Sequence, residues 1–227
     1  MRTKRGLHVH AGEQPYTLAE EIANVLTHGM GAALAVVAFA LLAALASIHG
    51  TFDHMLALVV YGATLVLLYL ASTLYHAVRH HGAKRVFRIC DHAAIFLLIA
   101  GTYTPYALIG LGGPFGWSVF ALMWTAAICG IAFKIVCHDR YEKVSLAFYL
   151  GMGWIGVLML GPLIESVDAG GLMLLALGGL AYTGGVLFYV WEGLPFNHAV
   201  WHLFVLAGSV SHFLSIYLYV AAPQASI

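Results

Sequence analysis

Residues 22–48 read IANVLTHGMGAALAVVAFALLAALASI, a run that contains no Asp, Glu, Lys or Arg. A helix needs about 20 predominantly apolar residues to cross the hydrocarbon core of a bilayer. The run is longer than this requirement, and it is too long for the apolar part of a signal peptide. We therefore expect a permanent membrane-spanning helix at this position.

Six further stretches share this character, at residues 55–77, 89–111, 117–136, 144–164, 172–190 and 199–220. The chain is 62% hydrophobic and only 9% charged, whereas soluble domains have about 25% charged residues. The predicted fold class is an all-α membrane protein, a seven-transmembrane helix bundle. Residues 20–221 form the bundle, residues 1–19 an N-terminal tail and residues 222–227 a short C-terminal tail.

The basic residues predict the orientation of the bundle. All ten Lys and Arg lie in the N-terminal tail, between the second and third spans, or around the connection between the fourth and fifth. Because such residues collect on the cytoplasmic side, we expect a cytoplasmic N-terminus and an extracytoplasmic C-terminus. The formal net charge is zero, and no basic run is long enough to follow a phosphate backbone, so nucleic acid is excluded as a partner.

Polar and ionisable residues gather at the predicted cytoplasmic ends of four spans that are far apart in sequence. They are Glu20, Glu21, Asn24 and His28 in the first span, Ser72 and His76 in the second, Asp91 in the third, and His198 and His202 in the seventh. Such residues are energetically costly inside a membrane and indicate a functional site. We expect them to meet at one depth, with Asn197 as the N-cap of the last span.

Three of these residues predict a metal site. His198 and His202 are four residues apart and so share one helix face. With His76 they supply three imidazoles, the number typical of a catalytic zinc site with an open fourth position, and imidazole suits Zn²⁺ better than Mg²⁺ or Ca²⁺. We assign Asp91 as a base toward the zinc-bound water or as a partner of a ligand histidine, with Ser72 beside it.

Other polar residues have simpler interpretations. Histidines in membrane helices also make hydrogen bonds between helices. Asn24 and His28 could make such bonds, support the metal ligands from outside or serve as a substitute ligand; the first two interpretations are favoured, and Glu20 is assigned to the same supporting layer. His212 lies ten residues beyond His202, too deep to reach the same ion, and is predicted to make an interhelical hydrogen bond.

Taken together, these motifs resemble the hemolysin III family, the bacterial branch that is similar to the adiponectin and progestin receptors. The matching pieces are Glu20-Glu21-x-x-Asn24-x-x-x-His28, Ser72-x-x-x-His76, Asp91 followed by Ala100-Gly101-Thr102-Tyr103-Thr104-Pro105, and His198-x-x-x-His202 with Ser211-His212-Phe213. The resemblance implies a multi-pass protein of the bacterial inner membrane with an inward N-terminus. It also implies zinc held by His76, His198 and His202, with Asp91 contacting a zinc-bound water and Ser72 nearby.

Three functions remain open. The leading hypothesis is a zinc-dependent hydrolase of an amide or ester bond in a membrane lipid, with ceramide-like cleavage expected from the resembling receptors. The second is a pore-forming or cytolytic protein, which ranks lower because the outer halves of the spans look apolar in sequence whereas a water-filled pore is polar along its depth. The third is a sensor of membrane state with structural zinc, which four protein ligands would favour.

Overall fold

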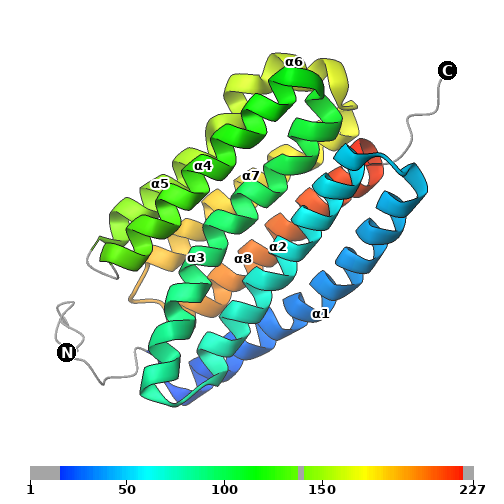
Figure 1. Ribbon diagram of the computed structural model, residues 1–227. Coiled ribbons are helices and arrows are strands. Elements are labelled where there is room, and N and C mark those ends of the chain that lie inside the picture. The colour runs from blue at the N-terminus through cyan, green and yellow to red at the C-terminus, as the bar shows by residue number, and fades with distance from the viewer. Residues whose placement is uncertain (1–15, 138–140, 222–227) are drawn as a thin grey trace.

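The computed structural model describes residues 16–137 and 141–221, which form a bundle of long helices without strands (Figure 1). Its elements are α1 (Leu18–His49), α2 (Phe52–Ala77), α3 (His81–Pro105), the π-helix η1 (Tyr106–Leu111), α4 (Gly113–Cys137), α5 (Glu142–Trp154), the 3₁₀-helix η2 (Ile155–Met159), α6 (Leu160–Ser166), α7 (Ala169–Val190), α8 (Asn197–Ser215) and the π-helix η3 (Ile216–Val220). Together they make seven segments long and apolar enough to cross a membrane. The predicted fold class is confirmed; residues 1–15 of the N-terminal tail, which was assigned to residues 1–19, and the C-terminal tail at residues 222–227 lie outside the described residues.

The start of α1 is fixed by a capping box. The Thr17 backbone N–H donates to Glu20 Oε2 at 2.8 Å, and the Glu20 N–H donates to Thr17 Oγ1 at 3.3 Å. This exchange satisfies backbone donors that a helix terminus leaves unpaired. Another oxygen of the carboxylate, Glu20 Oε1, accepts from the Phe196 N–H at 3.3 Å. Glu20 therefore joins the beginning of α1 to the beginning of α8.

Helix α3 begins earlier than the sequence predicts. It starts at His81 rather than at residue 89, so Lys84, Arg85 and Arg88 belong to its first turns instead of to the connection between spans. Long basic side chains can extend from a helix end toward the headgroups, which is why an apolar-run criterion misses these turns. As a consequence, Asp91 lies inside α3 rather than at its opening.

Helix α8 also starts differently from the prediction. Its N-cap is Phe196, in a left-handed conformation with φ of 57°, and Asn197 is the first helical residue. The Asn197 amide instead donates to the carbonyls of Phe188 at 3.1 Å and Tyr189 at 3.3 Å. The N-cap assignment of Asn197 is wrong because its side chain satisfies carbonyls that the end of α7 leaves free.

The helices pack unevenly around the bundle. Pairs α1 and α2, α2 and α3, and α7 and α8 are in extensive contact, whereas α5 and α6 touch their neighbours sparsely. Close approach of α2 and α3 requires a glycine, because a Cβ on Gly101 would collide with the Thr64 side chain. The loose packing of α5 and α6 leaves space inside the bundle, and that space leads to the site.

Candidate metal centre

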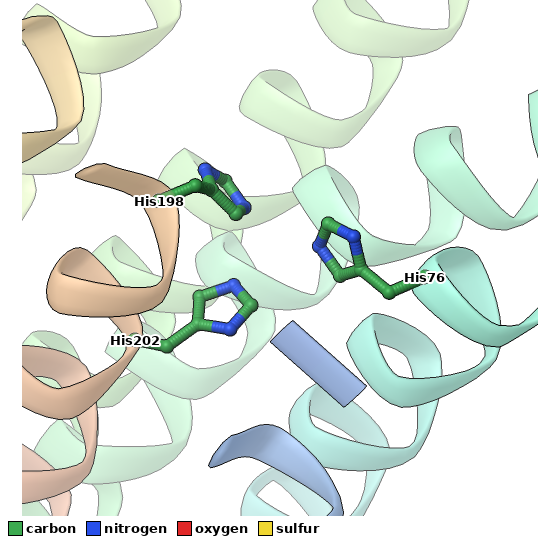
Figure 2. A group of neighbouring side chains, drawn as sticks. All are labelled: His76, His198 and His202. Carbon is green, nitrogen blue, oxygen red and sulfur yellow. The ribbon is translucent and has the colours of Figure 1, made fainter. Parts of the chain in front are cut away.

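The three predicted metal ligands lie together. His76 is in the last turn of α2, and His198 and His202 are in the first turns of α8; all three are buried. One nitrogen from each ring lies within 4.8 Å of the other two. Ring centroids are 5.1 Å apart for His76 and His198, 5.2 Å for His76 and His202, and 4.5 Å for His198 and His202. Figure 2 shows the rings from the two helices turned toward a shared space.

This donor set fits a zinc ion. Nε2 of His76 and Nε2 of His198 are buried and have no hydrogen-bond partner within the described part of the chain, and such groups are destabilising unless something binds them. With Zn–N distances of about 2.0–2.1 Å, tetrahedral ligand nitrogens are roughly 3.3 Å apart. Small rotations of the side chains would bring the three rings to that spacing.

The other nitrogen of His76 is held by an acidic residue. Nδ1 of His76 lies 2.6 Å from Glu21 Oε2, and the Asn24 amide is 3.3 Å from the same nitrogen. The Lys84 ammonium donates to Glu21 Oε1 at 2.7 Å and to the Tyr75 carbonyl at 2.9 Å. Because a carboxylate accepts, His76 donates through Nδ1–H and keeps the Nε2 lone pair for a metal.

His202 is oriented in the same way by different partners. Thr27 Oγ1 donates to the Ala23 carbonyl at 2.9 Å and lies 3.1 Å from His202 Nδ1, so the hydroxyl accepts from that nitrogen and leaves Nε2 free. The His28 ring stacks on His202 with centroids 3.4 Å apart and 13° between planes. Nδ1 of His28 is hydrogen-bonded to Ser72 Oγ at 2.7 Å. His28 thus supports a ligand and stands outside the group of three.

The two residues assigned to catalysis are adjacent. The Ser72 hydroxyl is hydrogen-bonded to the Asp91 carboxylate as well as to His28. Both residues are buried and line the same cavity as His198 and His202. The structure therefore brings Asp91 and Ser72 to the histidines, as their shared membrane depth predicts.

Lys134 is a member of this region that sequence analysis assigned to the flank of a basic loop. It is 1% exposed, lines the cavity, and is close enough to Asp91 to interact with its charge. A signal was present in the sequence. Met123, Ala127, Gly130 and Lys134 follow one another at spacings of three and four residues, so the lysine continues the inward face of α4.

Glu20 is outside the site. Its carboxylate is engaged in the capping box of α1, and the acidic residue beside the histidines is Glu21. Helical geometry distinguishes the two: with 3.6 residues per turn, Glu21 lies about 20° from His28 around the helix and Glu20 about 80°. The supporting position beside the histidines that was predicted for Glu20 is occupied by Glu21.

Tyr16, just before α1, covers the cluster and was not anticipated. Its ring lies 5.0 Å from His198 and 5.7 Å from His76. Burial raises the pKa of the Tyr16 phenol well above its usual range, so the ring stays neutral. An uncharged aromatic ring therefore lies beside two of the three histidines at this end of the bundle.

A cavity of about 300 Å³ connects the site to the opposite half of the bundle. Near the histidines its lining is polar, and farther along it is mainly aliphatic and aromatic. Lining residues at the far end include Leu111, Val119, Leu163, Leu172 and Leu175. Its shape and lining suit a long apolar chain with one polar end.

The buried faces of the outer half are not uniformly apolar, contrary to the sequence-based expectation. In the half of the bundle away from the histidines, the Tyr106 hydroxyl donates to Ser215 Oγ at 2.7 Å, and the Ser215 hydroxyl donates to the Gly171 carbonyl at 2.7 Å. His212 Nε2 lies 3.0 Å from the Leu175 carbonyl, so the interhelical hydrogen bond predicted for His212 is confirmed. Such groups are hard to recognise in the sequence, because apolar residues on the other faces of the same helix surround each polar residue that faces the interior.

Comparison with known proteins gives one consistent family. Residues 16–213 match the family described as Haemolysin-III related. Hemolysin-3 of Bacillus cereus is 50% identical over 207 residues, which cover 91% of this chain and 94% of the relative. The Hemolysin-3 homolog of Bacillus subtilis (strain 168) is 41% identical over 204 residues, covering 90% and 96%. The monocyte to macrophage differentiation factor of Homo sapiens is 33% identical over 214 residues, covering 92% and 87%.

The matched region contains every residue of the candidate centre, from Tyr16 to His202. It also contains six complete spans and most of the seventh. Seven spans together with bacterial relatives are consistent with a multi-pass protein of the inner membrane. On these grounds the chain belongs to the haemolysin-III related family of integral membrane proteins.

Proposed function

We propose that this protein is a zinc-dependent hydrolase that cleaves an amide or ester bond of a membrane lipid and so affects membrane lipid homeostasis. The observation that carries the proposal is the convergence of three buried imidazoles, two of which, those of His198 and His202, line a mainly apolar cavity. The histidines are at the ends of their membrane helices. Lipid carbonyls lie at a similar depth, where headgroups meet hydrocarbon.

His76, His198 and His202 would hold the ion. Zinc with three protein ligands brings the pKa of a bound water close to neutrality and polarises a carbonyl. Among the described residues the cluster has three members rather than four, which supports an open position over a closed structural site. His28 is a further imidazole beside the cluster, but it is already engaged, because it is hydrogen-bonded to Ser72 and stacked on His202.

Asp91 is the general base in this scheme. It takes a proton from the attacking water as the new C–O bond forms, and it returns a proton to the leaving amine or alcohol as the scissile C–N or C–O bond breaks. The products are a carboxylic acid and an amine or alcohol. Ser72 orients the Asp91 carboxylate through their hydrogen bond, and Lys134 adds a positive charge beside it.

The cavity accommodates the acyl chain of the substrate. Its wall combines aliphatic residues with aromatic ones, such as Tyr149 and Trp201, over most of its length. A lipid held there would place its first carbonyl near His198 and His202, which line the polar end. Ceramide-like amides are the first substrates to test, because of the similarity to the adiponectin receptors.

The test measures zinc content and fatty-acid release for the wild-type protein and for His202→Ala, in bilayers of ceramide and phosphatidylethanolamine. We expect both quantities to fall in the variant. His54→Ala is the matched control, since His54 is a helix-start residue at the other end of the bundle, bonded to Thr51. Full zinc occupancy with undiminished turnover in His202→Ala would reject the proposal.

Cytolytic activity is the second candidate. The two bacillary relatives carry the name Hemolysin-3, and the hydroxyl groups of Tyr106 and Ser215 place buried polar surface in the half of the bundle away from the histidines. The candidate ranks second because these hydroxyls are paired with each other and with the Gly171 carbonyl rather than free to line a channel. Purified protein in planar bilayers decides the matter: stepwise conductance supports a pore, and an unchanged baseline rejects it.

A further inference from the structure

His212 lines the outer part of the cavity and carries a hydrogen-bond acceptor on its ring. It lies ten residues beyond His202 on α8, about 15 Å along the helix axis, and it lines the same cavity. Its Nε2 is 3.0 Å from the Leu175 carbonyl of α7. A carbonyl oxygen only accepts, so Nε2 carries the hydrogen and Nδ1 carries the lone pair.

That acceptor is buried, and its ring is held in place. His212 is 9% exposed, and its Nδ1 has no hydrogen-bond partner among the described residues. The ring packs directly on the backbone of Gly178, where any Cβ would collide with it, and against the Tyr182 ring at a centroid distance of 5.4 Å. The imidazole therefore cannot turn to find another partner without breaking its bond to α7.

The neighbouring hydroxyls are already engaged. Tyr69 and Tyr182 are both hydrogen-bonded to Ser209, and Ser215 donates to the Gly171 carbonyl. A buried acceptor without a partner, on a residue that lines an apolar cavity, is destabilising until a donor reaches it. The ligand group that satisfies it must donate a hydrogen bond while the rest of the ligand remains apolar.

We propose that His212 Nδ1 accepts a hydrogen bond from a hydroxyl group carried at mid-chain by the acyl chain in the cavity, so that the protein selects hydroxylated lipids. The identification of the occupant as an acyl chain rests on the proposed function. The position agrees, because an extended chain with C–C bonds of about 1.5 Å advances roughly 1.25 Å per carbon, so that about 15 Å along the axis reaches roughly the twelfth carbon of an 18-carbon chain. His212 then acts as a specificity residue for the lipid tail, remote from the metal.

Binding measurements test this directly. The full chain in detergent is titrated with octadecanoic acid, its mid-chain hydroxylated counterpart and the corresponding mid-chain methyl ether, while fluorescence of the cavity residues Trp154 and Trp201 is followed. One hydrogen bond should make the hydroxylated acid bind roughly two- to tenfold more tightly than the plain acid. The ether, which cannot donate, should show no such gain.

His212→Phe keeps an aromatic ring but removes the acceptor, and it should reduce the ratio of the two affinities to one. Thr102→Val is the control, because Thr102 also lines the cavity but its hydroxyl already donates to Leu98; the ratio should persist there. An unchanged ratio in His212→Phe, tight binding of the ether, or no preference in the wild type would overturn the proposal. If His212→Phe does not fold, the ether comparison still decides.

The ratio of the two affinities can be measured whether or not the protein cleaves a lipid. A preserved ratio in a protein that releases no fatty acid would reject the hydrolase and leave the His212 site intact. Hydrolysis without tighter binding of the hydroxylated acid would reject the His212 site and leave the hydrolase intact. The two ideas can therefore fail separately.

Discussion

Glu21 Oε2 lies 2.6 Å from Nδ1 of His76, whose other ring nitrogen is buried without a hydrogen-bond partner among the residues that the structure describes. A carboxylate behind a ligating histidine fixes its tautomer and ring direction, and losing such a partner usually lowers metal affinity 10–100-fold, to order of magnitude. We predict a loss of this size for Glu21→Gln. Competition with a chelator of known zinc affinity measures it on the purified protein.

The adjacent acidic residue provides the control for this prediction. Glu20 bonds to Thr17 and to the Phe196 N–H, away from the histidines. Glu20→Gln should lower thermal stability slightly, because the capping box is weakened, and leave zinc affinity unchanged. Equal zinc affinities for the two variants would show that Glu21 does not position His76.

Two adjacent glycines of α7 should respond oppositely to alanine. A Cβ on Gly178 would collide with the His212 ring and approach the Gly208 carbonyl, whereas nothing lies within 4 Å of a Cβ on Gly179. Overpacking of this kind costs about 1–3 kcal/mol. Gly178→Ala should lower the thermal unfolding midpoint in detergent, and Gly179→Ala should leave it unchanged or raise it. Equal unfolding midpoints for the two variants would contradict this prediction and would mean that α7 and α8 move apart easily to accommodate the added methyl group.

Labelling from outside the cell tests the predicted orientation. In a variant without Cys90, Cys129 and Cys137, single cysteines are placed at Arg79 and at Asp168, which lie between α2 and α3 and between α6 and α7. Basic residues gather at the Arg79 end, so that end should be cytoplasmic. A membrane-impermeant maleimide should label Asp168→Cys on intact cells and Arg79→Cys only after permeabilisation. The opposite pattern would invert the topology.

The number of spans and the meeting of three histidines could be predicted from the sequence because both depend on one coordinate, depth in the membrane. Runs of apolar residues mark where the chain crosses, and His76, His198 and His202 sit at equivalent ends of their runs. Depth says nothing about direction around a helix. Depth therefore does not distinguish Glu20 from Glu21, and it does not identify Thr27 as the partner of His202.

Features that depend on packing were harder to predict. The cavity exists because α5 and α6 contact their neighbours sparsely, and no local pattern encodes a poor fit between distant helices. Runs of apolar residues also do not locate the helix ends. Lys84, for example, belongs to α3 and is hydrogen-bonded to Glu21 inside the bundle. Its burial depends on a partner 63 residues away, which sequence spacing alone does not identify.

The charges of Lys134 and Asp91 should be energetically coupled. Both are buried, on α4 and α3, and they interact electrostatically. Removing one member of a buried charged pair leaves the other uncompensated, which typically costs about 3–5 kcal/mol, whereas replacing both can be nearly neutral. We therefore expect Lys134→Met and Asp91→Asn each to destabilise the protein, and the double variant to be more stable than the sum of the single effects predicts.

A double-mutant cycle from chemical unfolding in detergent measures this coupling, for which about 1–3 kcal/mol is expected between residues in contact. Zinc content serves as the second readout. Lys134 and Asp91 are not among the three proposed zinc ligands, so both single variants should retain the ion. Asp91→Asn should nevertheless lose lipid release. Additive effects on stability would show that Lys134 is compensated elsewhere, and loss of zinc in Asp91→Asn would make that residue a ligand rather than a base.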